Sequence, residues 1–306
     1  MKMSIKHSSN LLSGSALLSA LLLFAGCNST DGPATPQEQR TAIQVSSGIQ
    51  TKAYDNKWEE NDAIGVFMLN GNTLEQENNK YTTIGSTGTF SADATNTIYF
   101  PIDGTRRDFV AYYPYQSLSQ GATTLTLSVN DQYSQKKIDL MGCSKVTGKH
   151  KNDPKVNFAF NHKLVKIVMT IEPEYPSLTR ADLQSMKVEI TNQQLKGTYN
   201  VLKGGDVTVD KVSDPADITL RTTADGTFSE GIILPNTSTA GMQLRFTLRN
   251  GMVFTWIIST APSSKRYEAG NKYIYSITLK RTALEVTSTI TNWGSGNGNG
   301  ESGSAE

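Results

Sequence analysis

Short runs in which apolar and polar residues alternate recur along most of this chain. They are rich in Thr, Tyr, Val and Ile and are separated by Gly, Asn and Asp, a pattern typical of β-strands. In the first half we expect strands at 41–50, 62–69, 97–100, 107–113 and 123–129. No convincing amphipathic helix interrupts them, so the pattern predicts an all-β fold.

The alternation becomes clearer after the polar, turn-prone stretch 148–154, which we take as a boundary between two domains. Apolar residues alternate along 156–171 but change phase near Leu164, which predicts one long strand containing a bulge. Further strands are expected at 185–191, 197–202, 216–221, 228–234, 242–249, 252–259 and 273–280. This series of strands favours a β-sandwich.

A further alternating segment, 283–293, follows these strands and ends at Trp293. Leu284, Val286 and Ile290 are separated by even numbers of positions, so in an extended chain their side chains would point to the same face. This predicts an extra strand. The final residues, 294–306, are Gly, Ser and Asn with few apolar side chains. Such a segment buries too little surface to offset the entropy of ordering, so we expect a flexible tail.

The N-terminal 26 residues have the features of a signal peptide. Lys2 and Lys6 precede an apolar stretch that is short for a membrane span, and Ala25-Gly26 are small residues. The segment LFAGC resembles a lipobox, in which signal peptidase II cuts before Cys27 and this cysteine carries the lipid, including palmitate. Residues 27–40 then form a flexible lipidated spacer. An ordinary secretory signal with a chance cysteine is the alternative.

Composition sets limits on partners and on stabilising chemistry. Removal of Lys2 and Lys6 with the signal peptide leaves slightly fewer basic than acidic residues, and this balance does not favour binding to nucleic acid. About 280 residues remain, which favours two domains. Cys143 is the only other cysteine, so we expect no intramolecular disulfide. After residue 27 no apolar run is long enough for a membrane helix.

Residues that often carry chemistry here fit structural roles better. His150 and His162 are too few for a metal site, and we expect His162 to be a packed structural histidine. Glu59, Glu60 and Asp62 precede an apolar strand, where acidic residues serve turns.

The remaining candidates are aromatic residues and one thiol. Tyr112, Tyr113 and Tyr115 surround Pro114 and could stack on a sugar, but a core position is favoured. Cys143 is expected to pack as a small apolar residue. No phosphate-binding loop, metalloprotease or nucleophile-elbow motif occurs, so we predict no enzyme activity, cofactor or metal.

Several strand and turn segments together resemble the Bacteroidales fimbrillin-like proteins, the type V pilin family. The resemblance covers 41–293 and is carried by 51–68, 109–114, 138–141, 160–171 and 273–293. It implies two transthyretin-like antiparallel β-sandwich domains in tandem, 41–154 and 155–293. It also implies a precursor that travels to the outer membrane as a lipoprotein.

In this family a trypsin-like protease cuts after a basic residue near the first strand, and the vacated groove accepts a strand from the next subunit. By this resemblance, a cut after Lys52 removes the strand at 41–50 together with the lipid. A cut after Arg40 releases the lipid but leaves the strand in place. An arginine-specific protease would not recognise Lys52, so both positions remain candidates.

The resemblance implies a structural subunit of a cell-surface pilus that supports adhesion or colonisation. Its partners would be other pilin subunits and a processing protease, and its C-terminal segment 283–293 would supply the donor strand through Leu284, Val286 and Ile290. The alternatives are a permanently anchored surface lipoprotein that binds a glycan or host protein, and a pilus anchor subunit.

Overall fold

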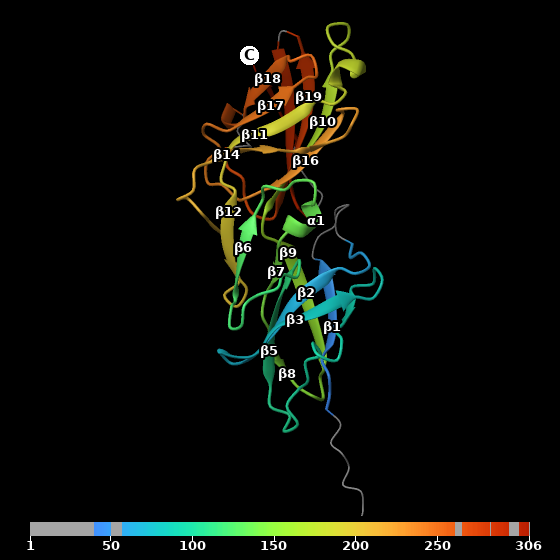
Figure 1. Cartoon of the computed structure of the whole chain (residues 1–306), viewed down its shortest axis with the longest axis vertical. Coiled ribbons are helices and arrows are strands. Elements are labelled where there is room, and N and C mark those ends of the chain that lie inside the picture. The colour runs from blue at the N-terminus through green and yellow to red at the C-terminus, as the bar shows by residue number, and fades with distance from the viewer. Residues whose placement is uncertain (1–39, 50–56, 261–264, 282, 294–299, 306) are drawn as a thin grey trace, which may run out of the picture. The chain divides into compact units, whose positions relative to one another are not determined.

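The regular secondary structure of the described residues consists almost entirely of β-strands (Figure 1). The computed structural model describes residues 40–49, 57–260, 265–281, 283–293 and 300–305. Residues 40–306 form one compact unit by their internal contacts. The all-β prediction is confirmed. The helical elements in the described residues are single turns, α1 (Gln135–Ile138), η1 (Arg180–Leu183) and η2 (Ile258–Thr260).

The largest sheet contains the strands of the first half of the chain except β6, together with one strand from beyond residue 154. In order, it consists of β2 (Ala63–Asn70), β3 (Thr73–Thr83), β4 (Thr89–Ser91), β1 (Gln44–Ile49), β9 (Lys155–His162), β7 (Met141–Cys143), β5 (Arg107–Tyr113) and β8 (Val146–Lys149). Because β2 also pairs with β5, the succession of paired strands returns to its starting point. Strand β1 therefore lies inside a closed circuit of pairings, between β4 and β9.

Strands β2 and β5 are covered on both faces. Ile64, Val66 and Met68 point into one hydrophobic cluster with Val45 and Trp58, while Phe67 and Leu69 join a second cluster. Every residue of β2 between its two ends is buried, so its sequence is continuously apolar rather than alternating. The second cluster continues into the rest of the molecule.

Three smaller sheets hold the remaining strands of the described residues. One has the order β15 (Arg221–Thr222), β16 (Phe228–Ile233), β10 (Val165–Pro173), β19 (Asn271–Lys280), β20 (Ala283–Asn292) and β21 (Gly300–Ala305). Another has the order β14 (Ala216–Thr219), β11 (Lys187–Gln193), β17 (Gln243–Thr247) and β18 (Val253–Ile257), and the smallest has β13 (Thr208–Val209), β12 (Lys196–Asn200) and β6 (Thr124–Ser128).

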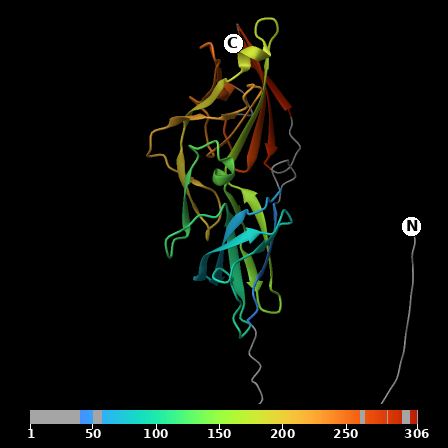
Figure 2. The same cartoon turned by 45° about the vertical axis from the view of Figure 1, so that its right-hand side comes forward.

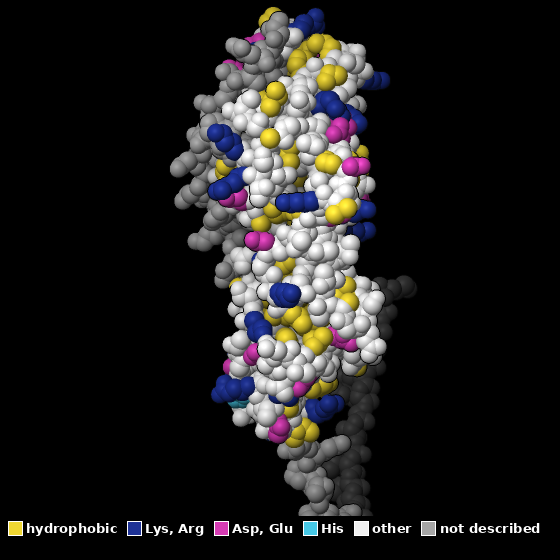
Figure 3. Space-filling view, turned by 90° about the vertical axis from the view of Figure 1, so that its left-hand side faces the viewer, with side chains coloured by type: hydrophobic (Ala, Val, Ile, Leu, Met, Phe, Trp, Pro, Cys, Tyr) yellow, Lys and Arg dark blue, Asp and Glu magenta, His cyan; other side chains and the backbone are white. Residues whose placement is uncertain are grey.

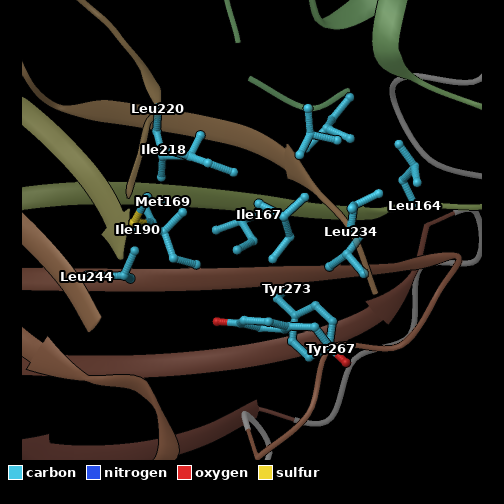
Figure 4. Packing of buried hydrophobic residues seen from close by; sticks show 14 of the residues in the cluster. Leu164, Ile167, Met169, Ile190, Ile218, Leu220, Leu234, Leu244, Tyr267 and Tyr273 are labelled. Carbon is cyan, nitrogen blue, oxygen red and sulfur yellow. The ribbon is translucent and has the colours of Figure 1, made fainter. Parts of the chain in front are cut away.

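The core of the second half is built from alternate residues of these strands (Figure 4). Ile167 and Met169 of β10 lie beside Tyr273 of β19 and face Ile190 of β11 and Leu244 of β17, and all five are buried. This arrangement places two sheets face to face over an apolar layer. The alternation predicted for these segments is therefore the signature of one buried face on each strand.

Not all neighbours are antiparallel, contrary to our prediction. Strand β1 runs parallel to β9, and β10 runs parallel to β19. Figure 2 shows the same cartoon as Figure 1 after a turn of 45°. Parallel neighbours are joined through long connections, and local alternation contains no information about which distant strand will be the neighbour.

The predicted long strand 156–171 is wrong, because it is two strands, β9 and β10, in different sheets. The change of phase near Leu164 is the point where the chain leaves one sheet for the other. Strand 97–100 is also wrong, since this segment makes only an isolated bridge between Tyr99 and Ala42. The amide of Ile98 instead donates to the Tyr81 hydroxyl.

The division into domains 41–154 and 155–293 remains a prediction. Pairings cross this position: β9 lies in the first sheet, and β6 pairs with β12. Of the expected tail, 294–299 and 306 lie outside the described residues, whereas the backbone of 300–305 forms β21 beside β20. In the part of the chain that the structure describes, no helix is long and apolar enough to cross a membrane.

Candidate interaction site at the first and last long strands

Strand β1 is held by backbone pairing along both edges. Its residues pair in parallel with β9, from Gln44 opposite Lys155 to Ile49 opposite Phe160, and in antiparallel with β4. The amide of Gln44 donates to the Pro154 carbonyl at 2.8 Å, and the amide of Ser47 donates to the Gly88 carbonyl at 2.8 Å. The prediction of a strand within 41–50 is confirmed.

Alternate side chains of β1 and the residue before it are buried. Ile43, Val45 and Ser47 are only 6%, 3% and 9% exposed, whereas Gln44 and Gly48 are exposed. Ile43 and Val45 belong to the first hydrophobic cluster, with Val45 opposite Phe90 of β4 and Val156 of β9. The strand therefore fills the core and does not merely cover it.

An aromatic group closes the core near β1. The ring of Trp58 lies 5.0 Å from Phe90, 5.3 Å from Tyr113 and 5.6 Å from Phe160, measured between centroids, and each contact is edge-to-face. Edge-to-face contacts of this kind add to the stabilisation from burial. The core into which β1 packs therefore contains large aromatic side chains in mutual edge-to-face contact.

A glycine turn approaches β1 very closely. Gly88 has φ +74°, and a Cβ atom there would lie 2.4 Å from the Ser47 carbonyl oxygen and 3.3 Å from Trp58 Cδ1. The hydroxyl oxygen of Ser47 is sealed from solvent and has no hydrogen-bond partner among the described residues. The Ser47 side chain is thus enclosed by surrounding atoms, and Gly88 lies close to the backbone of the same residue.

Strand β20 lies in the second half of the molecule, and the prediction of a strand in 283–293 is confirmed. It pairs antiparallel with β19 along its whole length and with β21 on its other edge. Val286 is 2% exposed and Ser288 is 6% exposed, while Glu285 and Thr287 are exposed. Ile290 is partly buried against the second hydrophobic cluster. The side chain of Leu284 lies outside the described residues.

Trp293 fixes the end of β20 to the first sheet. Its ring stacks on His162 of β9 with centroids 4.0 Å apart and planes 4° apart, and its amide donates to the Gly270 carbonyl. His162 Nδ1 lies 2.7 Å from Asp139 Oδ1. His162 is thus a packed residue, as predicted, and sequence reasoning did not find its stacking partner.

The acidic residues that precede β2 occupy structural positions. Asp62 is 5% exposed, accepts from the Tyr113 hydroxyl and the Glu59 amide, and lies 2.8 Å from Lys136 Nζ. Glu59 also pairs with Lys136, at 2.7 Å. The acidic cluster therefore organises the turn before β2, as predicted.

The predicted packing of the tyrosines and the thiol is also found. Tyr112 and Tyr113 are buried, and burial raises the pKa of Tyr112 to about 12. Tyr115 is half-buried, with Lys80 Nζ 5.5 Å from its ring centroid. Cys143 is 7% exposed, and burial raises its thiol pKa to about 11. No group of three or more metal-ligating side chains occurs within the described ranges.

The predicted processing residues are only partly visible. Arg40 is exposed and lies four residues before the start of β1, with its guanidinium 5.0 Å from the centroid of the Tyr99 ring. Cys27 and Lys52 lie outside the described residues. On the face shown in Figure 3, Lys and Arg side chains are interspersed with Asp and Glu rather than gathered into a patch of one sign.

Comparison with known proteins defines the class to which this all-β chain belongs. The sequence model described as "Fimbrillin-like" matches residues 51–293. This match covers most of the chain, so the chain belongs to the fimbrillin-like family, as the sequence analysis predicted. The family is one of fimbrial structural subunits rather than enzymes.

Individual relatives agree with this assignment. A protein of Bacteroides uniformis named as a candidate fimbrium subunit, Fim1C, is 48% identical over 95% of this chain and 99% of its own length. A crystal structure of a candidate cell adhesion protein from Bacteroides uniformis has 46% identity and a TM-score of 0.77, covering 85% of this chain and all of that one. A similarly described protein from Bacteroides ovatus shares the fold, with 21% identity, a TM-score of 0.68 and coverage of 83% and 98%.

Proposed function

We propose that this chain is a structural subunit of a cell-surface pilus, or fimbria, that supports adhesion or colonisation. The name of the 48% identical relative as a fimbrium subunit supports this function. The observation that carries the mechanism is the place of β1, which is buried inside a closed circuit of strands yet lies immediately before the candidate cleavage residue Lys52. The first strand is thus both essential to the precursor core and separable from it by one cut.

Removal of β1 would leave a groove between β4 and β9. Exposing the sites of Ile43 and Val45 costs ~3–6 kcal/mol at about 1.5–3 kcal/mol for each side chain. The edges of β4 and β9 would also lose their hydrogen-bond partners in β1. Such a groove strongly favours a replacement strand.

Strand β20 of a second copy is the proposed replacement. A donated strand must present apolar side chains at alternate positions, as Leu284, Val286 and Ile290 do in sequence. Burying three such side chains contributes ~5–9 kcal/mol before the cost of leaving their own sheet. Because the donor and acceptor surfaces differ, two joined subunits still have one free acceptor groove and one free donor strand. The assembly therefore grows as an open filament.

The lipid on Cys27 would hold the precursor at the outer membrane until it is processed. The intact β1 blocks the groove during this stage, so the precursor is folded but cannot accept a strand. A protease that cuts after Lys52 removes the lipid and β1 together. A cut after Arg40 would release the subunit with its groove still filled, because Arg40 precedes β1.

The direct test compares Lys52→Ala with Arg40→Ala in the full-length precursor. We expect the wild type and Arg40→Ala to form ladders of oligomers after treatment with a trypsin-like protease, whereas Lys52→Ala stays monomeric. If only Arg40→Ala loses the ladder, the cleavage position is wrong. Protein that keeps lipidated Cys27 and never forms ladders would instead be a permanently anchored lipoprotein or an anchor subunit, and the proposal would fail.

A further inference from the structure

The first strand and the last long strand have closely similar sequences. Residues 42–50 are AIQVSSGIQ, and residues 283–291 are ALEVTSTIT. The identical pairs in this alignment are Ala42 and Ala283, Val45 and Val286, Ser47 and Ser288, and Ile49 and Ile290. Ile43 is aligned with Leu284 and Gln44 with Glu285, so the pattern of apolar and polar positions is the same throughout.

Burial follows the same alignment although the two strands lie in different sheets. Val45 and Ser47 are buried in β1, and their counterparts Val286 and Ser288 are buried in β20. Gln44 is exposed, as is Glu285. The strands are therefore matched in the side chains they insert into a core, not only in composition.

A small residue disfavours reversed insertion in the register that fills the same four sites. When 283–291 is aligned with β1, the residues that fall at the inward-facing positions of β1 are Leu284, Val286, Ser288 and Ile290, and of these only serine is not apolar. In reverse, Val286 would occupy position 47, where the Ser47 hydroxyl is already sealed by surrounding atoms. Ser288 would then occupy the site of Val45 and leave a cavity.

The same argument fixes the register. Ser288 is the only small side chain at these inward positions, so any shift by two residues puts a larger side chain at position 47. The closeness of Gly88 to the Ser47 backbone leaves no room for the strand to move outward there. Only the alignment of Ser288 with Ser47 satisfies both limits.

Charge favours the same direction. In this alignment Glu285 takes the place of Gln44, directly opposite Lys155 of β9. Opposite charges on directly paired residues stabilise neighbouring strands. In the reversed direction Glu285 would lie opposite Ala159 and would gain no such partner.

We propose that β20 of a second copy enters the groove parallel to β9, with Leu284, Val286, Ser288 and Ile290 at positions 43, 45, 47 and 49. Ser288 is the residue that selects this register. A reversed strand that kept Ser288 at position 47 would place Asn292 at the buried apolar site of Ile43, which disfavours that direction. The inference rests on the proposed function, since it specifies how one copy of the chain recognises another.

Disulfide trapping tests the direction in full-length protein. The pair Glu285→Cys and Lys155→Cys should cross-link successive subunits after processing, because directly paired residues on neighbouring strands have a separation that suits a disulfide. The pair Thr289→Cys and Lys155→Cys is the matched control, since these residues would be neighbours only in the reversed direction. Non-reducing gels of processed, oxidised protein give the readout.

The outcomes separate this inference from the proposed function. Cross-linked ladders with the first pair alone support it. Ladders that are cross-linked only by the second pair overturn the direction while leaving strand exchange intact. Failure of processed wild-type protein to form any oligomer refutes the proposed function, and this inference with it.

A peptide of residues 283–291 tests the role of Ser288 without altering the folded protein. Added during processing, it should occupy the groove and shorten the ladders. We expect the Ser288→Ala peptide to be equally effective and the Ser288→Leu peptide to be at least about five-fold weaker, as overpacking of a filled site predicts. Equal inhibition by the leucine peptide would refute the register.

Discussion

Gly88→Ala is predicted to weaken the packing of β1 more than its backbone strain alone explains. Alanine at φ +74° costs about 1–2 kcal/mol in the left-handed region. The new Cβ would also lie 2.4 Å from the Ser47 carbonyl oxygen, and relieving such a clash costs about 1–3 kcal/mol. The free energy of unfolding should therefore fall by about 2–5 kcal/mol.

Gly85→Ala is the matched control because Gly85 has φ +62° in the same loop but nothing within 4 Å of the added Cβ. Only the backbone cost of about 1–2 kcal/mol applies there. Urea unfolding of both full-length variants, followed by tryptophan fluorescence, measures the difference. Equal losses in the two variants would refute the close approach of β1 to Gly88.

Three further predictions concern the same fold. Asp62→Ala should lower the free energy of unfolding by about 2–4 kcal/mol in urea melts, because it leaves the buried Tyr113 hydroxyl without its acceptor. Glu60→Ala is the control: Glu60 is exposed, so its replacement should change the free energy of unfolding by less than about 0.5 kcal/mol. Burial raises the pKa of the Cys143 thiol from 9.0 to about 11, so the stability that the buried neutral thiol contributes is complete below pH 9 and is lost as the pH rises toward 11. In that window the free energy of unfolding of the wild type should fall relative to that of Cys143→Ala by up to about 3 kcal/mol. Parallel pH profiles of the two proteins would contradict this. Trp293→Ala should lower the free energy of unfolding by about 3–5 kcal/mol, since this 1% exposed ring stacks on His162, and a loss below 1 kcal/mol would contradict the packing.

The strands that alternation predicted best are those with one buried face. β1 buries Val45 and Ser47, β20 buries Val286 and Ser288, and both strands were located from sequence. β3 was missed because most of its residues are exposed or only partly buried, so it has few apolar positions to reveal it. The junction of β9 and β10 was misinterpreted because no Gly or Pro separates them.

Neighbour relations between distant strands could not be predicted in this way. The parallel pairing of β1 with β9 joins residues more than one hundred positions apart, and hydrophobic pattern specifies which face is buried, not which strand is adjacent. The stacking of Trp293 on His162 is of the same kind. The two residues therefore gave no sequence signal for their contact.

The central claim is that the assembled subunit has exchanged its first strand for the last strand of a neighbour. N-terminal sequencing of subunits purified from surface-assembled pili tests it most directly. The account predicts Ala53 as the first residue, because cleavage after Lys52 removes β1. A first residue of Thr41, or lipidated Cys27, would show that β1 remains in its groove and would contradict the account.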